Sequence, residues 1–222
     1  MHHYSWDFAA LGPYLPLFWR GAKVTLFFTF STVIVGLVVG LLAGLLRSLA
    51  PRWAAIPARI YIDIFRCTPL LVQIVWGFYA LPVLTGVNLS AGVACFITLS
   101  LYAGSFYAEV FRAGIEAIDR GQWEAGQAIG MHRHKVFRRI ILPQAVRIML
   151  PAFINNTVMN LKNTSLVSTV TVGDLLYQGQ VISATTFRPL EAYTTVAVIY
   201  FAMLFPLTLL SDRLEKHMGV HR

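Results

Sequence analysis

The chain has 222 residues, of which 57% are hydrophobic and only 13% are charged, whereas about a quarter are charged in ordinary soluble domains. This composition excludes a typical soluble enzyme or binding module and favours a protein embedded in a membrane. The formal net charge of +8 does not indicate nucleic-acid binding. The Lys and Arg residues flank apolar runs, and no basic stretch is interleaved with aromatic residues.

The first apolar run, residues 24–46, contains no charged side chain and is bounded by Lys23 and Arg47. Because roughly 20 helical residues cross the hydrocarbon core of a bilayer, this run predicts the first transmembrane helix. The residues before it do not have the pattern of a cleavable signal peptide.

Three glycines recur at intervals of four residues within this run: Gly36, Gly40 and Gly44. On a helix they form a ridge of small residues that lets a second helix approach closely. The sequence leaves open whether the ridge contacts another helix of the same chain or a second subunit.

A basic linker, residues 47–66, follows the first span. In its second half Ile60, Ile64 and Phe65 fall on one helical face. This pattern predicts a short amphipathic helix lying along the inner surface of the membrane.

Two further apolar runs predict the second and third transmembrane helices, at residues 70–84 and 91–108. The third helix is expected to continue into the cytoplasm and to end at Gly121, because charges of alternating sign follow it at helical spacing. These charged residues are Glu109, Arg112, Glu116 and Arg120. We interpret them as a solvated face rather than a catalytic carboxylate pair.

A charged segment, residues 121–143, separates the third span from the fourth. It predicts a short helix at 123–129, a bend at Gly130 and a second helix at 132–142 with its apolar residues on one face. Pro143 is expected to separate this second helix from the next span. The result would be a helical hairpin under the membrane.

The predicted fourth span, residues 144–162, is less apolar and carries three asparagines. Asn155 and Asn156 lie about 18 Å along a helix from Pro143, near the middle of the bilayer. Polar side chains at this depth line cavities or bond neighbouring helices. We therefore name Asn155, Asn156 and Asn160 as candidate substrate-path residues, with interhelical hydrogen bonding as the alternative.

A mixed segment, residues 163–191, precedes the predicted fifth span at 192–210. Asp174 in this segment is interpreted as a cap of the local backbone rather than a substrate contact. With five spans, fourteen of the 18 Lys and Arg residues fall on one side. The other four are Arg20, Lys23, Lys162 and Arg188. The positive-inside rule then places the N-terminus outside and the C-terminus inside.

Catalytic and metal-binding residues are not predicted. No Asp, Glu or His falls centrally in any predicted span. His132 and His134 point in different directions on a helix, which argues against a metal site. Cys67 and Cys95 are interpreted as small buried side chains.

The most specific motif lies in the charged segment. It is Glu124-Ala125-Gly126, then Gly130, Ile140 and Leu142-Pro143. This spacing resembles the EAA loop of permease subunits of ABC importers. Gly126 stands where that family usually has alanine.

The resemblance extends over about residues 60–166. Within this range the chain is similar to the permeases for polar amino acids of the histidine, glutamine and arginine group. The segments that carry it are FRCTPLLVQ, YAEVFRAGIEAIDRGQWEA, LPQAVRIMLP and LKNTSL. Cys67 is a departure, since this family often has glycine before Thr-Pro.

The resemblance implies an all-α membrane protein of the type I ABC importer permease fold, a single domain over residues 1–222, in the bacterial inner membrane. It implies that the hairpin is a coupling helix seated in a cytosolic ATPase. The coupling residues would be Glu124, Ala125, Gly126, Gly130, Ile140, Leu142 and Pro143. ATP and Mg²⁺ would bind to two ATPase subunits, which fits the absence of a GxxxxGK[ST] loop here. A second permease subunit and an extracytoplasmic solute-binding protein would complete the assembly.

Two other classes of function fit the sequence less well. A stand-alone ion-coupled carrier or channel would favour inverted repeats and charged residues at mid-membrane, and an intramembrane enzyme would need convergent catalytic groups at depth. The sequence shows neither pattern. It leaves open which amino acid or derivative is carried, and whether the subunit pairs with itself or with a paralogue.

Overall fold

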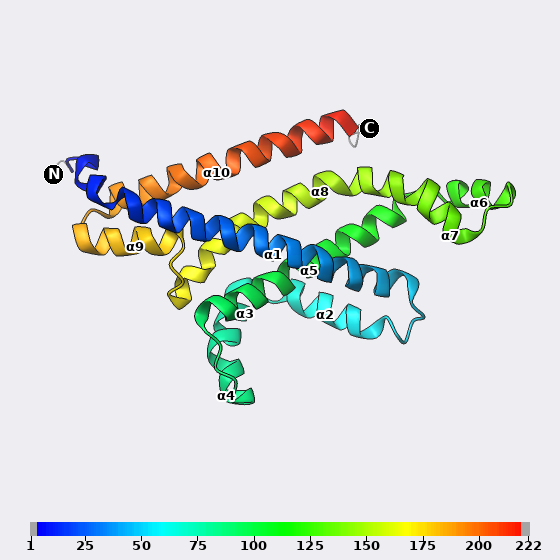
Figure 1. Ribbon diagram of the computed structural model, residues 1–222, viewed down its shortest axis with the longest axis horizontal. Helices are drawn as coiled ribbons and strands as arrows, with labels where there is room; N and C mark the ends of the chain where they lie inside the picture. The colour runs from blue at the N-terminus through cyan, green and yellow to red at the C-terminus, as the bar shows by residue number, and fades with distance from the viewer. Residues whose placement is uncertain (1–3, 219–222) are drawn as a thin grey trace. The chain divides into compact units, whose positions relative to one another are not determined.

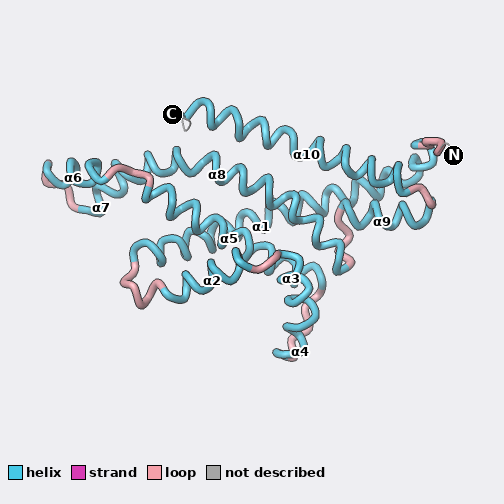
Figure 2. Tube along the Cα trace, turned by 180° about the vertical axis from the view of Figure 1, so that it is seen from behind, coloured by secondary structure: helices cyan, strands magenta, loops and turns pink. Residues whose placement is uncertain are grey.

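The computed structural model describes residues 4–218, which are helical almost throughout and contain no β-strand (Figure 1, Figure 2). In chain order the α-helices are α1 (Leu15–Leu49), α2 (Ile56–Cys67), α3 (Leu70–Val75), α4 (Leu81–Thr85), α5 (Ala91–Glu116), α6 (Arg120–Ala128), α7 (Arg133–Val136), α8 (Leu142–Asn163), α9 (Leu175–Thr186) and α10 (Pro189–Met218). Two 3-10 helices, η1 (Phe8–Tyr14) and η4 (Thr164–Val170), and two π-helices, η2 (Trp76–Ala80) and η3 (Phe137–Ile141), complete the set.

Three helical stretches of the described chain are long and apolar enough to cross a bilayer: Phe8–Ser48, Ala91–Glu116 and Pro189–Leu214. A bent pair, Ile56–Cys67 with Leu70–Thr85, meets the criterion only together. The helix α8, which covers the predicted fourth span, has sufficient length but is less apolar. An all-helical membrane fold is confirmed, while the five-span count and the orientation stay predictions.

The described chain divides into two compact units. The first comprises residues up to Thr32, Pro69–Leu99 and Met159–Pro206. The second comprises Val33–Thr68, Ser100–Val158 and the residues from Leu207 onward. The helices α1, α5, α8 and α10 therefore each contribute residues to both units.

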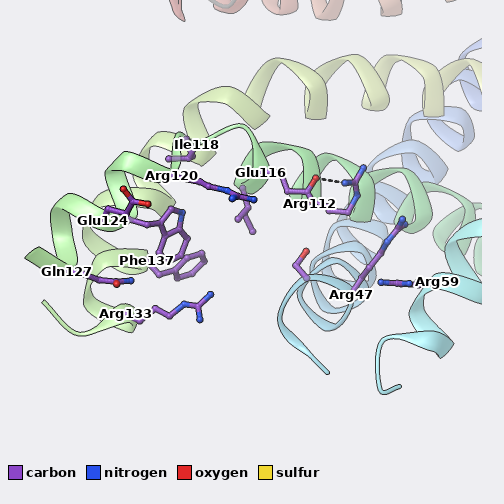
Figure 3. Close-up of a pocket in the computed structure, with 13 residues that line it drawn as sticks. Arg47, Arg59, Arg112, Glu116, Ile118, Arg120, Glu124, Gln127, Arg133 and Phe137 are labelled. Atoms are coloured by element: carbon purple, nitrogen blue, oxygen red, sulfur yellow. Dashed lines mark hydrogen bonds and ion pairs between the residues drawn. The ribbon is translucent and has the colours of Figure 1, made fainter. Parts of the chain in front are cut away.

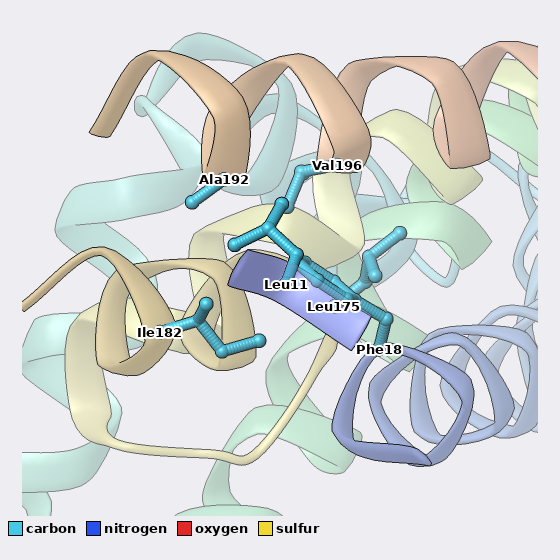
Figure 4. Close-up of a cluster of buried hydrophobic side chains, with 6 residues drawn as sticks. All are labelled: Leu11, Phe18, Leu175, Ile182, Ala192 and Val196. Carbon is cyan, nitrogen blue, oxygen red and sulfur yellow. The ribbon is translucent and has the colours of Figure 1, made fainter. Parts of the chain in front are cut away.

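The first unit is organised around a buried apolar cluster formed by η1, the start of α1, α9 and the start of α10 (Figure 4). Its members are Leu11, Phe18, Leu175, Ile182, Ala192 and Val196. The helix α9 is capped by Asp174, whose carboxylate accepts hydrogen bonds from the backbone N–H groups of Leu176 and Tyr177 at 3.3 and 2.9 Å. The predicted capping role of Asp174 is thereby confirmed.

The segment predicted as the second span is helical and belongs to the first unit, but it is not one regular helix. The elements α3, η2 and α4 follow one another without a break from Leu70 to Thr85. The π turn directly precedes Pro82, which has no backbone N–H to donate to a regular helix turn. Such single π turns commonly interrupt an α-helix without ending it.

The second unit is built on close packing of α1 against α5. The ridge glycines of α1 lie directly on α5, so that a Cβ atom at Gly40 would stand 2.6 Å from Tyr107 Cβ and 2.8 Å from the Gly104 carbonyl oxygen. Gly36 likewise faces Ala103. The partner of the ridge is therefore a helix of the same chain.

Two predictions about this region were wrong. The helix α5 ends at Glu116 rather than at Gly121, because Asp119 caps the next helix by accepting a hydrogen bond from Gly121 N at 2.6 Å. Cys67 is exposed at the end of α2, whereas Cys95 is buried as expected.

Candidate functional site

The predicted helical hairpin is present as α6, α7 and η3 of the second unit (Figure 1), whereas its place under the membrane stays a prediction. Its turn is a Schellman motif, in which Met131 N donates to Gly126 O at 3.1 Å and Gly130 N donates to Gln127 O at 2.9 Å. Gly130 has φ of +80°, a conformation that side chains disfavour. The bend predicted at Gly130 is confirmed.

The role predicted for Pro143 was wrong. The elements α7, η3 and α8 form one continuous helix, and Pro143 lies in the first turn of α8. In the π turn ahead of it Leu142 N donates to Phe137 O, so that the helix passes the proline without breaking. The second arm of the hairpin is therefore the beginning of the helix predicted to cross the membrane.

The two arms of the hairpin pack closely because Gly126 is buried between them. A Cβ atom at Gly126 would stand 2.7 Å from Val136 Cγ2 and 3.2 Å from Ile140 Cδ1. Next to this contact, an apolar cluster packs the hairpin against the end of α5 and the beginning of α8. Its buried members are Ile118, Val136, Ile141, Ala145 and Met149. The hairpin is thus fixed to two long helices and would move with them.

The motif residues divide into two groups by exposure. Gly126 is buried and Ile140 is half-buried, and both hold the arms together. The exposed residues are Glu124, Ala125, Gly130, Leu142 and Pro143. Only this second group is available to a partner protein.

One exposed apolar residue of the hairpin was missed from the sequence. Ile129 lies between α6 and Gly130 and is 76% exposed. Single exposed apolar side chains are common on protein surfaces, but its place at the tip of the hairpin makes Ile129 available to a partner protein. In the sequence, only the position of Ile129 immediately before the bend could have indicated its exposure. Its actual exposure depends on how the two arms of the hairpin pack.

A cavity of about 850 Å³ lies beside the hairpin, between α6 and α7 on one side and the ends of α1, α2 and α5 on the other (Figure 3). Its lining residues are Arg47, Ser48, Arg59, Arg112, Ile115, Glu116, Ile118, Arg120, Trp123, Glu124, Gln127, Arg133 and Phe137. The Trp123 and Phe137 rings stack at 6.2 Å, and the Arg133 guanidinium lies 5.8 Å from the Trp123 ring. The cavity is therefore basic, with an aromatic wall.

The predicted charge ladder on α5 is only partly solvated. Arg112 bridges Glu109 and Glu116 as the spacing predicts. Glu109 also binds Arg47 of α1 and, at 3.7 Å, Arg66 of α2, and its side chain is only 16% exposed. The carboxylate thus ties three helices of the second unit together. Arg120 belongs to α6 and makes no ion pair with any carboxylate that the structure describes.

The three candidate substrate-path asparagines have different surroundings. Asn156 lines a second cavity of about 520 Å³, which Arg66 and Glu109 also line, whereas Asn155 is exposed. Asn160 belongs to the first unit, is 3% exposed and donates from Nδ2 to Thr32 Oγ1 at 2.8 Å. That bond is the interhelical contact named above as the alternative for Asn160.

A metal site is not formed by the described residues, among which no three His, Cys, Asp or Glu side chains cluster. His132 and His134 are both exposed.

Residues 36–220 match the protein family described as "Binding-protein-dependent transport system inner membrane component". The chain is 36% identical over 217 residues to the glutamine transport system permease protein GlnP of Escherichia coli (strain K12), covering 97% of this chain and 99% of that protein. It is 31% identical to the arginine transport system permease protein ArtQ of Bacillus subtilis (strain 168), covering 96% and 97%. It is also 36% identical to the octopine transport system permease protein OccM of Rhizobium meliloti, covering 87% and 85%.

Two solved structures are similar in fold. The structure of an amino acid ABC transporter with histidines superposes with a TM-score of 0.91 at 34% identity, covering 96% of this chain and all of that one. An inward-facing MetNI methionine ABC transporter superposes with a TM-score of 0.77 at 22% identity, covering 93% and 98%. The second likeness bears on the fold alone.

Proposed function

Since this chain belongs to the family of inner-membrane components of binding-protein-dependent transport systems, we propose that it carries a polar amino acid or an amino-acid-like solute into the cell. The chain is a permease subunit of an ABC importer, located in the inner membrane. Its relatives serve glutamine, arginine and octopine. These substrates share an α-amino acid moiety, which defines the class proposed here.

Coupling to two cytosolic ATPase subunits is assigned to the hairpin. The observation that carries this assignment is the rigid attachment of a solvent-facing hairpin to α5 and α8 by a buried cluster. A partner that grips the hairpin would move both helices, and ATP binding could then bias an inward- or outward-facing state. ATP and Mg²⁺ belong to those partners, and a second permease subunit and a solute-binding protein complete the assembly.

The first test concerns the exposed tip. Ile129→Ser removes the apolar contact without burying a charge, and we expect the ATPase that co-purifies with the tagged permease to fall at least tenfold, as for a contact worth more than about 1.4 kcal/mol. Val87→Ser is the matched control, because Val87 is also exposed (55%) but lies in the loop between α4 and α5. Equal co-purification of both variants with the unmodified chain would argue against the assignment.

The second test concerns the bend. Gly130→Arg is expected to leave the chain inserted but to abolish coupled uptake, because a left-handed residue other than glycine costs roughly 1–2 kcal/mol. Nothing lies within 4 Å of a Cβ at this position, so the strain is in the backbone alone. Gly130→Asn should retain most uptake, since asparagine tolerates this conformation. Normal uptake by the arginine variant contradicts the proposal.

The substrate path is assigned to the cavity that contains Asn156. Its lining includes a guanidinium from Arg66 and an amide from Asn156, which can bind the α-carboxylate of an amino acid. The Glu109 carboxylate also lines the cavity but is already bound by arginines. Asn155 and Asn160 are retained as secondary candidates for the path.

Substrate binding to single asparagine variants tests this path. We expect Asn156→Ala to weaken the affinity for the substrate amino acid about tenfold, as the loss of a hydrogen bond to a charged group would. Asn155→Ala is expected to have a smaller effect because its side chain is exposed. Affinity and selectivity unchanged in both variants would remove this helix from the path.

A further inference from the structure

The cavity beside the hairpin has an excess of positive charge, since five arginines but only two glutamates line it. Arg47 is paired with Glu109, and Arg112 is paired with Glu109 and Glu116. The other three lining arginines, Arg59, Arg120 and Arg133, have no carboxylate within 4.0 Å in the described part of the chain.

These three unpaired arginines come from different elements. Arg120 begins α6, Arg133 begins α7 and Arg59 lies on α2. In Figure 3, Arg120 and Arg133 reach into the cavity from the hairpin, and Arg59 lies beside Arg47 on the opposite side. Like charges around one cavity repel each other, and an anion bound between them replaces this repulsion with attraction. The charge of the cavity therefore fits an anionic ligand such as a phosphate ester.

The helix α2 indicates where the anion comes from. Ile56, Ile60 and Ile64 form a stripe along α2 and are each at least 50% exposed, whereas Ala58 and Ile62 on the other face are buried. An amphipathic helix with an exposed apolar stripe lies at the membrane interface with that stripe in the lipid.

We propose that this cavity binds the headgroup of an anionic phospholipid of the inner leaflet. Its phosphate pairs with Arg59, Arg120 and Arg133, and its acyl chains run along the isoleucine stripe of α2. Basic pockets at the cytoplasmic ends of transmembrane helices favour such headgroups. The inference depends on the proposed function only in placing this end of the chain at the cytoplasmic face.

A bound lipid would connect the hairpin to the rest of the second unit. Arg120 and Arg133 belong to the hairpin, whereas Arg59 belongs to α2. A phosphate shared between them holds the hairpin at a fixed distance from α2. The stimulation of ATP hydrolysis by substrate then depends on the anionic lipid content of the inner leaflet.

The test measures lipid retention by the permease–ATPase complex. The complex is incorporated into nanodiscs of phosphatidylcholine with phosphatidylglycerol, extracted in mild detergent and analysed by native mass spectrometry. Arg59→Gln combined with Arg120→Gln should retain at least tenfold less phosphatidylglycerol. Arg138→Gln combined with Arg139→Gln removes the same charge from exposed positions that do not line the cavity, and it should retain the lipid fully.

Several outcomes overturn the proposal. They are equal retention by the two double variants, displacement of the lipid by inorganic phosphate alone, and a photocrosslinker at position 59 that captures the ATPase and never a lipid. Capture of phosphatidylglycerol by that crosslinker supports it. Co-purification of the ATPase is scored separately, and lipid retention is also measured on the permease without ATPase, so that failure of the coupling assignment is distinguishable from failure of the lipid site.

Discussion

Gly126, the third residue of the EAA-like motif, shows how the packing of one residue depends on its neighbour, Val136. The usual alanine at this position would not fit here, because Val136 already occupies the space beside Gly126. Val136 is completely buried and β-branched, so its methyl groups cannot move away easily. The substitution of glycine for alanine is therefore a matter of packing between the two arms of the hairpin.

Gly126→Ala is expected to destabilise the permease by about 1–3 kcal/mol through overpacking. Val136→Ala should relieve the clash, so that the double variant is more stable than the sum of the single changes predicts by at least about 0.5 kcal/mol. A double-mutant cycle of thermal unfolding in detergent measures this coupling. Strict additivity of the two changes would show that the contact is not strained.

A second single-residue effect concerns Asp174, which lies outside the predicted spans. Its burial raises the pKa of its carboxyl from 3.8 to about 6, and the hydrogen bonds from Tyr177, Leu176 and Tyr200 oppose part of this shift. The folded state therefore holds a proton that the unfolded chain releases. The contribution of this carboxyl to the free energy of unfolding is therefore fully present below about pH 4. It is lost as the pH rises through about 6.

Asp174→Asn removes this titration while it keeps an oxygen that can cap α9. Relative to the unmodified chain, the variant should gain stability as the pH rises from 4 to 7, by up to ~3 kcal/mol. Unfolding temperatures of both proteins at several pH values measure the difference. A difference that stays constant over this range is incompatible with a buried carboxyl that titrates near pH 6.

Among the helices, the close packing of α1 against α5 forms the centre of the second unit. The glycines on α1 let the two backbones approach until Cβ positions meet carbonyl oxygens. Within lipid, this kind of van der Waals contact replaces the hydrophobic driving force that water supplies to soluble proteins. The contact also brings Arg47 within reach of Glu109.

Gly40→Ala should lower the stability of the detergent-solubilised chain by about 1–3 kcal/mol, because the new methyl group meets backbone atoms of α5. Gly92→Ala is the matched control, since nothing lies within 4 Å of a Cβ at that position of α5. The control should be neutral or stabilising by up to about 1 kcal/mol. Equal melting temperatures for the two variants would refute the close contact.

At the scale of the whole molecule, helix content, the hairpin and the family were predictable from sequence. Apolar runs bounded by charges marked α1, α5 and α10, and Gly130 marked the bend. The helix α8 was harder to assign to the membrane because its composition is mixed. The continuity of this helix through Pro143 was also unpredictable, since a preceding π turn lets a proline follow without a break.

The candidate sites were predictable in position but not in role. The motif spacing identified the hairpin, yet only the packed arms separate buried Gly126 from exposed Glu124. The asparagines of α8 were chosen by depth, although one of them bonds Thr32 inside the first unit. The exposure of a side chain and its hydrogen-bond partners depend on which helices pack together. The periodicity of the sequence does not show which helices these are.

The sequence alone determined that this is a helical membrane protein with a helical hairpin, because hydrophobic length and glycine placement are local properties of the chain. Its resemblance to a known family indicated a permease. Only the tertiary structure showed that Glu109 pairs with arginines of three helices, that the glycine ridge of α1 packs against α5, and that arginines without a carboxylate partner line one cavity. Residues far apart in sequence create these features when they pack together, and the free energy of each contact depends on its neighbours.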